Sequence, residues 1–263
     1  MFKAVFTKET PDSRGALSRL VSAFIGRDVS VVKITANEPA IDNLRDRQMR
    51  FDIACKTEKG EPVNVEMSLN PTPIEPVRLE FHIGKLFTGQ DIRGDGKGYG
   101  DLKEAYQIAF LVKERFFRDD AFLHSFEYYD PKNGVTLGGR GRIITVELSK
   151  LDKVLEKTVK EMTDPERWAF YFRYLRDLDK RREINEILEY AEGIAMASNV
   201  LMTISRDEVE RAKLMSEFKY EVDTRTHINH TKQEIARNLK AMGLNLGQIV
   251  EATGLSEERV KEL

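Results

Sequence analysis

The sequence predicts an α/β protein, in which a mixed β-sheet flanked by helices is followed by an all-α C-terminal region. Short β-branched or apolar runs alternate with helical patterns as far as residue 150, and helical spacing alone follows. The chain has 263 residues, 41% of them hydrophobic, which suffices for one large domain or two small ones. We expect one domain over residues 1–150, a helical region over 151–223 that packs on or extends it, and a C-terminal module over 224–263.

The first expected elements are a helix and a β-branched run. Apolar residues recur at helical spacing between Gly15 and Ile25, and Gly26 follows as a stop signal. The run Val29–Ile34 is rich in β-branched residues, which are enriched in strands. We interpret this run either as a strand or as the end of a loop.

A predicted two-strand hairpin carries the most informative pair of residues. Its strands, Arg50–Cys55 and Val63–Ser68, are joined by a short polar turn. If the turn centres on Lys59, Asp52 and Glu66 lie opposite each other, because each is seven residues from the centre. Directly opposed side chains have Cβ atoms about 4.5–5.5 Å apart. Two carboxylates that close repel each other unless a cation lies between them, and Mg²⁺ prefers carboxylate oxygens and retained waters.

Two interpretations of this pair are open. In the first, Asp52 and Glu66 hold a metal ion that activates water against a phosphodiester. In the second, they lie on a solvated face, because polar residues that alternate with apolar neighbours are typical of any half-buried strand. The spacing is common, so the pattern alone does not choose between the two.

Loops, a helix and further strands complete the predicted first domain. Several prolines predict a loop and then a helix that begins near Pro76. The glycine-rich stretch Gln90–Gly100 is interpreted as a surface loop, because no Gly-Lys-Ser/Thr signature of a phosphate-binding loop accompanies it. Three strands are then expected, the second as the neighbour of the first: Ala105–Val112, Phe122–Tyr129 and Ile143–Leu148.

The rest of the chain predicts helices. The aromatic side chains of the second of these helices are typical of helix–helix packing. The expected helices cover residues 150–162, 165–178, 183–202 and 207–221.

The C-terminal segment resembles a minimal helix-turn-helix. Its expected helices cover residues 232–242 and 246–252 and a third stretch that begins at Glu257. The third helix carries more acidic than basic residues, and contact with phosphate needs net positive charge. The C-terminal segment is therefore at least as compatible with a packing or oligomerisation role as with DNA binding.

Composition limits the class of protein further. The net charge is −2, so no global basic field indicates nucleic-acid binding, and such a surface would have to be local. The single cysteine, Cys55, excludes an intrachain disulfide and is expected to be a buried, inert thiol. Neither a membrane-spanning apolar run nor a signal-peptide pattern is present. We expect a soluble cytoplasmic protein with no membrane contact and no organic cofactor.

Several segments, taken in order, resemble a known family. The first of them are Phe2–Phe6, Arg50–Ile53, Val63–Met67, Gly100–Leu102 and Val146–Lys150. A Met-Gly-Leu segment and Thr253–Ser256, in the helical half, complete the set. Together these segments resemble the Rpn family of recombination-promoting nucleases, often described as transposases, within the PD-(D/E)XK nuclease superfamily.

The resemblance implies a restriction-endonuclease-like core over residues 1–150 and Mg²⁺-dependent cleavage of DNA, with Mn²⁺ as a substitute. It implies that Asp52 and Glu66 are the metal ligands. It also implies a role in DNA recombination, in a mobile element or in phage defence. The third position of the motif, usually Lys in the superfamily and Gln in the family, is Ser68 here.

Ser68 is the departure with chemical consequences. It shares a strand face with Glu66, so it points to the same site. A serine hydroxyl can hold a water but cannot supply the positive charge that stabilises a developing anion. Arg78 or Lys85, on the following predicted helix, would then contact the DNA phosphate instead. The alternative is a catalytically weak or inactive nuclease-fold protein that acts in DNA binding or assembly, and the apolar helical half would suit a homodimer.

Overall fold

The computed structural model describes residues 2–35, 52–92, 96–113, 115–204 and 231–263. Its contacts divide the chain into two compact units, Met1–Arg206 and Asp207–Leu263, and each is described by itself. The predicted boundary between residues 223 and 224 lies outside the described residues.

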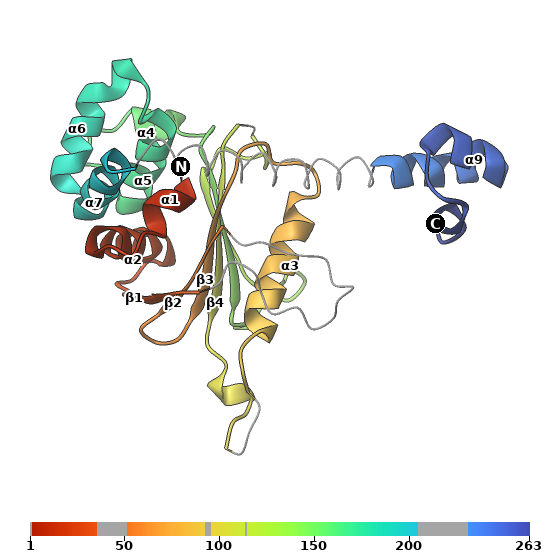
Figure 1. The fold of residues 1–263 in the computed structure, drawn as a ribbon, viewed down its shortest axis with the longest axis horizontal. Helices are drawn as coiled ribbons and strands as arrows, with labels where there is room; N and C mark the ends of the chain where they lie inside the picture. Colours follow the sequence, from red (N-terminus) through yellow and green to blue (C-terminus); the bar gives the residue numbers. More distant parts are fainter. Residues whose placement is uncertain (1, 36–51, 93–95, 114, 205–230) are drawn as a thin grey trace. The chain divides into compact units, whose positions relative to one another are not determined.

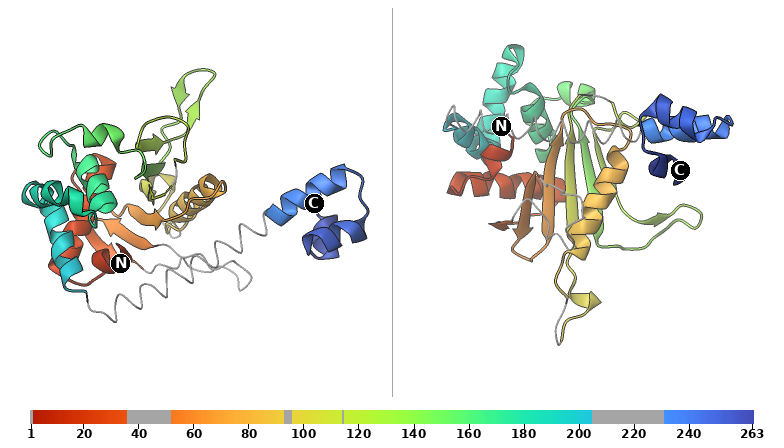
Figure 2. Two further views of the ribbon diagram at one scale, coloured as in Figure 1. Left: turned by 90° about the horizontal axis from the view of Figure 1, so that it is seen from above. Right: turned by 45° about the vertical axis from the view of Figure 1, so that its right-hand side comes forward.

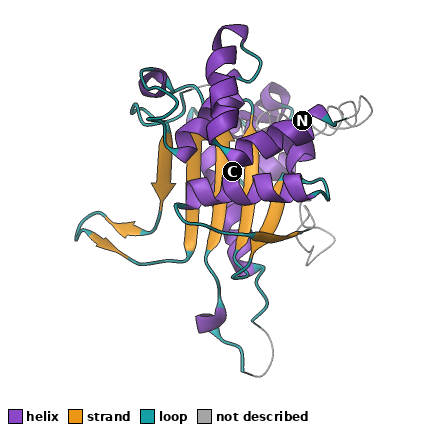
Figure 3. Cartoon of the chain, turned by 90° about the vertical axis from the view of Figure 1, so that its left-hand side faces the viewer, coloured by secondary structure: helices purple, strands orange, loops and turns teal. Residues whose placement is uncertain are grey.

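A mixed six-stranded sheet forms the centre of the first unit (Figures 1 and 3). Its strand order is β1-β2-β3-β4-β8-β5. The three inner neighbours β3, β4 and β8 run parallel, and the other pairs are antiparallel. A second, two-stranded sheet of β6 and β7 forms a hairpin that extends away from the main sheet (Figure 3). The strands are β1 (Val31–Ile34), β2 (Ile53–Thr57), β3 (Pro62–Ser68), β4 (Ala105–Leu111), β5 (Leu123–Phe126), β6 (Tyr129–Asp130), β7 (Val135–Thr136) and β8 (Gly141–Glu147).

Helices cover both faces of the main sheet (Figure 2). Helix α3 crosses one face, and the layer made by α1, α2 and α4 to α7 covers the other. The helices are α1 (Phe2–Phe6), α2 (Pro11–Ile25), α3 (Glu75–Thr88), α4 (Asp152–Leu155), α5 (Asp164–Tyr174), α6 (Arg181–Tyr190) and α7 (Glu192–Met202), with 3₁₀ turns η1 (Tyr99–Asp101) and η2 (Leu178–Lys180).

The main core lies between the sheet and the helical layer. Phe110 on β4 is fully buried and meets Phe24 and Phe172 edge to face, with ring centroids 5.2 and 4.9 Å apart. Burying a side chain of this size contributes about 1.5–3 kcal/mol. Cys55 lies in the same core, and burial raises the pKa of its thiol to about 12.

On the opposite face, small residues of the sheet make room for α3. Ala105 and Ala109 on β4 pack against Ile83 and Leu79 of the helix. Positions 79, 83 and 86 of α3 form one apolar stripe, as helical spacing requires. This stripe seats α3 over β4 and β8, and that placement decides which polar side chains of α3 reach β3.

The C-terminal unit has its own small core. Residues 231–241 are helical, followed by α9 (Leu246–Thr253) and α10 (Glu257–Lys261). Gly254 ends α9 with φ of +64°, a backbone conformation that favours glycine. Ala236, Ile249 and Val260 join the three helices in one buried cluster.

The predicted fold class is confirmed: a restriction-endonuclease-like α/β sheet flanked by helices, with helices at the C-terminus. Three details are wrong. Strand β5 does not pair with β4, because β8 returns between them and takes the parallel position beside β4. The helix expected over 183–202 is two helices, because Ala191 leaves helical geometry with ψ of 89°.

The helix expected over 150–162 is also shorter. It is the single turn α4, and further turns follow it. In the described part of the chain, no helix has the length and apolarity that crossing a membrane requires.

Candidate metal centre

The two predicted carboxylates lie at neighbouring positions of β2 and β3. Ile53 pairs with Val65, and Ala54 pairs with Asn64. Continuing this antiparallel register by one residue places Asp52, which directly precedes β2, opposite Glu66. The backbone N–H of Met67 also donates a hydrogen bond to Asp52 Oδ2, at 3.1 Å. The hairpin therefore holds both carboxylates at one end of the strand pair.

Glu66 is fully buried, and two polar side chains contact it from α3. Arg78 Nη2 lies 2.9 Å from Glu66 Oε1, and His82 Nδ1 lies 3.1 Å from Glu66 Oε2. The Asn64 amide also donates to Oε2, at 3.4 Å. A buried carboxylate is costly unless it is paired and hydrogen-bonded, and these contacts provide that compensation.

The polar contacts come from a second stripe of α3, next to the apolar one. Glu75, Arg78 and His82 are three and then four residues apart, so they share one face of the helix. Arg78 Nη2 also lies 2.5 Å from Glu75 Oε1, so its guanidinium bridges two buried carboxylates. Glu75 is buried as well, so the positive charge of Arg78 offsets part of the cost of burying both carboxylates.

The other predicted site residues, Ser68, Arg78 and Lys85, lie at different distances from the two carboxylates. Ser68 is nearly buried on β3, and its carbonyl accepts a hydrogen bond from the Val112 N–H at 3.0 Å. Arg78 contacts Glu66 directly. Lys85 lies farther along α3 with Nζ 5.8 Å from the centre of the Phe81 ring. Within the described residues, the structure shows no hydrogen bond or ion pair from Lys85 to either carboxylate.

His82 is a site residue that sequence reasoning missed. The signal was its spacing: it lies four residues after Arg78, which places both on one helical face. A single histidine between apolar residues of a helix does not by itself indicate which strand it faces, so the spacing became informative only with the helix seated on the sheet.

The donor set is compatible with a hard divalent cation. In the described part of the chain, no group of three or more His, Cys, Asp or Glu side chains is arranged to hold a metal. Mg²⁺ does not require one, since it is commonly held by one or two carboxylates together with waters and substrate phosphates. A carboxylate offers about four lone-pair positions, so the donors on Glu66 do not prevent it from binding a metal as well.

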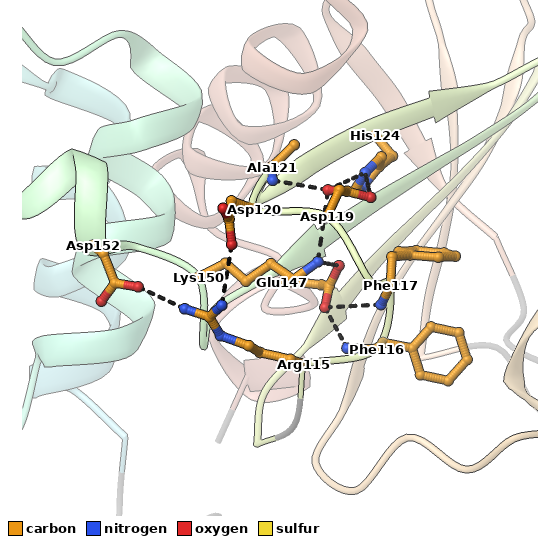
Figure 4. A network of polar contacts seen from close by, with 10 residues as sticks. All are labelled: Arg115, Phe116, Phe117, Asp119, Asp120, Ala121, His124, Glu147, Lys150 and Asp152. Carbon is orange, nitrogen blue, oxygen red and sulfur yellow. Dashed lines mark hydrogen bonds and ion pairs between the residues drawn. The ribbon is translucent and has the colours of Figure 1, made fainter.

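A second buried ion pair lies at the same end of the sheet (Figure 4). Ser68, Leu111 and Glu147 are in register across β3, β4 and β8. Glu147 is fully buried, with Oε1 2.6 Å from Lys150 Nζ. Its other oxygen accepts hydrogen bonds from the backbone N–H groups of Phe116 and Phe117, at 2.5 and 3.4 Å. This pair fixes the segment that leaves β4.

Surface ion pairs extend this second cluster. Arg115 contacts Asp120 at 3.2 Å and Asp152 at 2.7 Å (Figure 4). The Ala121 N–H and the His124 ring donate hydrogen bonds to Asp119 and lower the pKa of that carboxyl. Every carboxylate in this cluster already has a backbone or cationic partner, so the cluster is a structural clamp for the β4–β5 segment.

Comparison with known proteins identifies one family. The model of a PD-(D/E)XK nuclease family transposase matches residues 1–231. No curated protein and no solved structure matches the chain. The matched range includes both carboxylates of the hairpin and the whole of α3.

Proposed function

We propose that this chain, which belongs to the PD-(D/E)XK nuclease family transposases, is a metal-dependent endonuclease that hydrolyses phosphodiester bonds of DNA. The observation that carries the proposal is the placement of Glu66: fully buried, opposite Asp52, and held by Arg78 and His82. Burying an acid beside a second acid costs stability, and such arrangements are typical of functional sites rather than of solvated hairpins.

In this proposal each site residue has one role. Asp52 and Glu66 would hold Mg²⁺, or Mn²⁺ as a substitute. When bound, the metal would polarise the scissile phosphate and lower the pKa of a water. Ser68 orients the attacking water through its hydroxyl.

Arg78 and Lys85 of α3 supply the positive charge that the lysine of the superfamily motif would otherwise provide. Arg78 places a fixed positive charge beside Glu66, as it already does in the structure. Lys85 and Arg78 contact the DNA phosphate when substrate is bound. Positive charge next to the developing anion is what the lysine of the superfamily motif would supply.

A nicking assay tests this proposal. Plasmid DNA is incubated with Mg²⁺ or Mn²⁺ and with wild type, Asp52→Ala or Glu66→Ala. Of these three we expect only the wild type to nick, and a control variant should nick like the wild type. The matched control is Glu61→Gln, because Glu61 is also buried and paired with an arginine, but at the other end of the same hairpin. Equal nicking by all four proteins would refute the assignment.

A second candidate function is DNA binding or assembly without cleavage. The observation that favours it is Ser68, an uncharged side chain where the motif carries Lys or Gln. Isothermal titration with Mg²⁺ separates the two candidates. DNA binding by the wild type with no uptake of metal would favour the binding protein.

The proposal also covers domain organisation, oligomeric state and cellular context. We assign the nuclease domain to residues 1–150, with 151–223 extending it and 224–263 as a helix-turn-helix-like module. A homodimer would pair two centres for double-strand cleavage, in a cytoplasmic context of recombination, mobile elements or phage defence. Light scattering of the purified protein measures the oligomer directly, and a monomer at all concentrations would exclude the dimer.

A further inference from the structure

We propose that His82 is a positioning residue of this centre, which donates a hydrogen bond from Nδ1 to Glu66 and thereby fixes the orientation of that carboxylate. The inference rests on the proposed metal-dependent function, because it assigns a role within the same site.

The contact is buried from both sides. The His82 side chain is 5% exposed and the Glu66 side chain 0%, so little water competes for the 3.1 Å contact between Nδ1 and Oε2. His82 belongs to the polar stripe of α3, and the apolar stripe beside it, Leu79, Ile83 and Leu86, is buried as well. A buried polar ring is costly unless it is hydrogen-bonded, and Glu66 is a bonded partner in the structure.

The chemistry of the pair sets the direction of the hydrogen bond. An ionised carboxylate only accepts hydrogen bonds, so Nδ1 of His82 must carry the proton. Arg78 holds Oε1 and His82 holds Oε2, and both residues lie on one face of α3. Rotation of the carboxylate about its terminal torsion would move both oxygens away from these donors. The two side chains together therefore define one orientation of Glu66 relative to Asp52.

Orientation of a ligand affects metal affinity. Carboxylates that bind a metal are commonly held by an outer hydrogen-bond partner, and loss of that partner weakens metal binding by about 10- to 100-fold. We expect this magnitude for loss of the His82 hydrogen bond. A residue that only fills space would change stability and leave metal affinity unaltered.

Two substitutions separate hydrogen bonding from packing. His82→Asn keeps an N–H donor close to the position of Nδ1, whereas His82→Leu fills the space without a donor. Mn²⁺ affinity of the full-length chain is measured by isothermal titration, and thermal unfolding is measured alongside. We expect about 10- to 100-fold weaker binding for His82→Leu and near wild-type binding for His82→Asn. Equal affinity of wild type and His82→Leu would overturn the inference, as would an equal loss in both variants.

A metal-free measurement separates this inference from the proposed function. The ¹⁵N shifts of the His82 ring in the wild type report which nitrogen carries the proton. If the wild type binds no Mn²⁺, the proposed function fails and the ring shifts alone decide the inference. A proton on Nδ1 that responds to Glu66→Gln supports it, and a ring protonated only at Nε2 overturns it.

Discussion

Glu66 shows how a single buried acid is accommodated in a sheet interface. Its carboxylate is fully buried, and both of its oxygens have donors from α3. A pair that is exposed to water contributes little to stability, whereas breaking a buried pair leaves an uncompensated charge. The ion pair of Glu66 is buried, so we expect its loss to lower the free energy of unfolding by a measurable amount.

The substitution Arg78→Leu tests how much the guanidinium contributes to stability by pairing with the buried carboxylates. The substitution leaves Glu66 and Glu75 buried without the guanidinium that bridges them, and we expect a loss of about 3–5 kcal/mol in the free energy of unfolding. Urea denaturation of the metal-free protein measures it. Arg142→Leu is the control, since Arg142 forms a partly exposed pair with Glu127 and should cost about 0–1 kcal/mol. Similar losses in both variants would contradict the bridging role.

At the residue scale, the sequence predicted some of the centre and not the rest. The opposition of Asp52 and Glu66 followed from the hairpin alone, because strand pairing across a short turn is a local property. The partners of Glu66 were not accessible in the same way. Arg78 was expected at the phosphate and His82 was not expected at all, because their direction depends on how α3 rests on distant strands.

At the scale of elements, α3 divides its inward surface between packing and chemistry. The apolar stripe at positions 79, 83 and 86 seats the helix over β4 and β8, and the polar stripe at 75, 78 and 82 reaches β3. Small residues on β4 allow this close approach. Any change that lifts α3 from the sheet would therefore disturb Glu66 without touching it.

The buried ion pair of Glu147 and Lys150 is expected to stabilise the segment that leaves β4 (Figure 4). Glu147→Ala removes the carboxylate that lies 2.6 Å from Lys150, which is 1% exposed and retains a 3.8 Å contact with Asp119. The substitution also removes the acceptor for two backbone N–H groups. We expect a loss of about 3–5 kcal/mol in the free energy of unfolding.

The double variant Glu147→Leu/Lys150→Met supplies the control for that prediction. Replacing both partners by apolar residues avoids an unpaired buried charge, so part of the loss should be recovered. Chemical denaturation of both proteins gives the comparison. If the double variant is no more stable than Glu147→Ala, the ion pair is not what stabilises this segment.

Element predictions failed where long-range pairing decided the outcome. The spacing that predicted β5 as the neighbour of β4 could not show that a later strand, β8, would take that place. Likewise, the continuous helical pattern over 183–202 did not show the break at Ala191, which separates α6 from α7. Both outcomes depend on contacts between segments that are distant in the sequence rather than on local preference.

At the scale of the whole molecule, the chain is built as two compact units, Met1–Arg206 and Asp207–Leu263. The large core and the candidate centre lie in the first unit, and the second has a separate cluster around Ile249. Helices α4 to α7 share the main core with α2 and the sheet, so a border at 150 does not mark an independent core. The sequence could indicate the change to helices but not what they pack against.

A truncated chain of residues 1–206 tests this division. We expect it to be folded, with a thermal midpoint close to that of the full chain, because the buried clusters of the first unit lie within it. Circular dichroism during heating measures the midpoint. A chain of residues 1–150 is the comparison, and it should fail to fold because it lacks α5 and α7. Unfolded 1–206, or stable 1–150, would contradict the division.

The central claim is that Asp52 and Glu66 form one metal centre at the end of the β2–β3 hairpin. Anomalous scattering from crystals grown with Mn²⁺ tests it most directly. We expect a peak within bonding distance of an oxygen of each carboxylate, about 2.0–2.1 Å as for a small octahedral cation, and no such peak in Glu66→Gln. A well-ordered hairpin with no peak between the two carboxylates, or a peak that persists in Glu66→Gln, would contradict it.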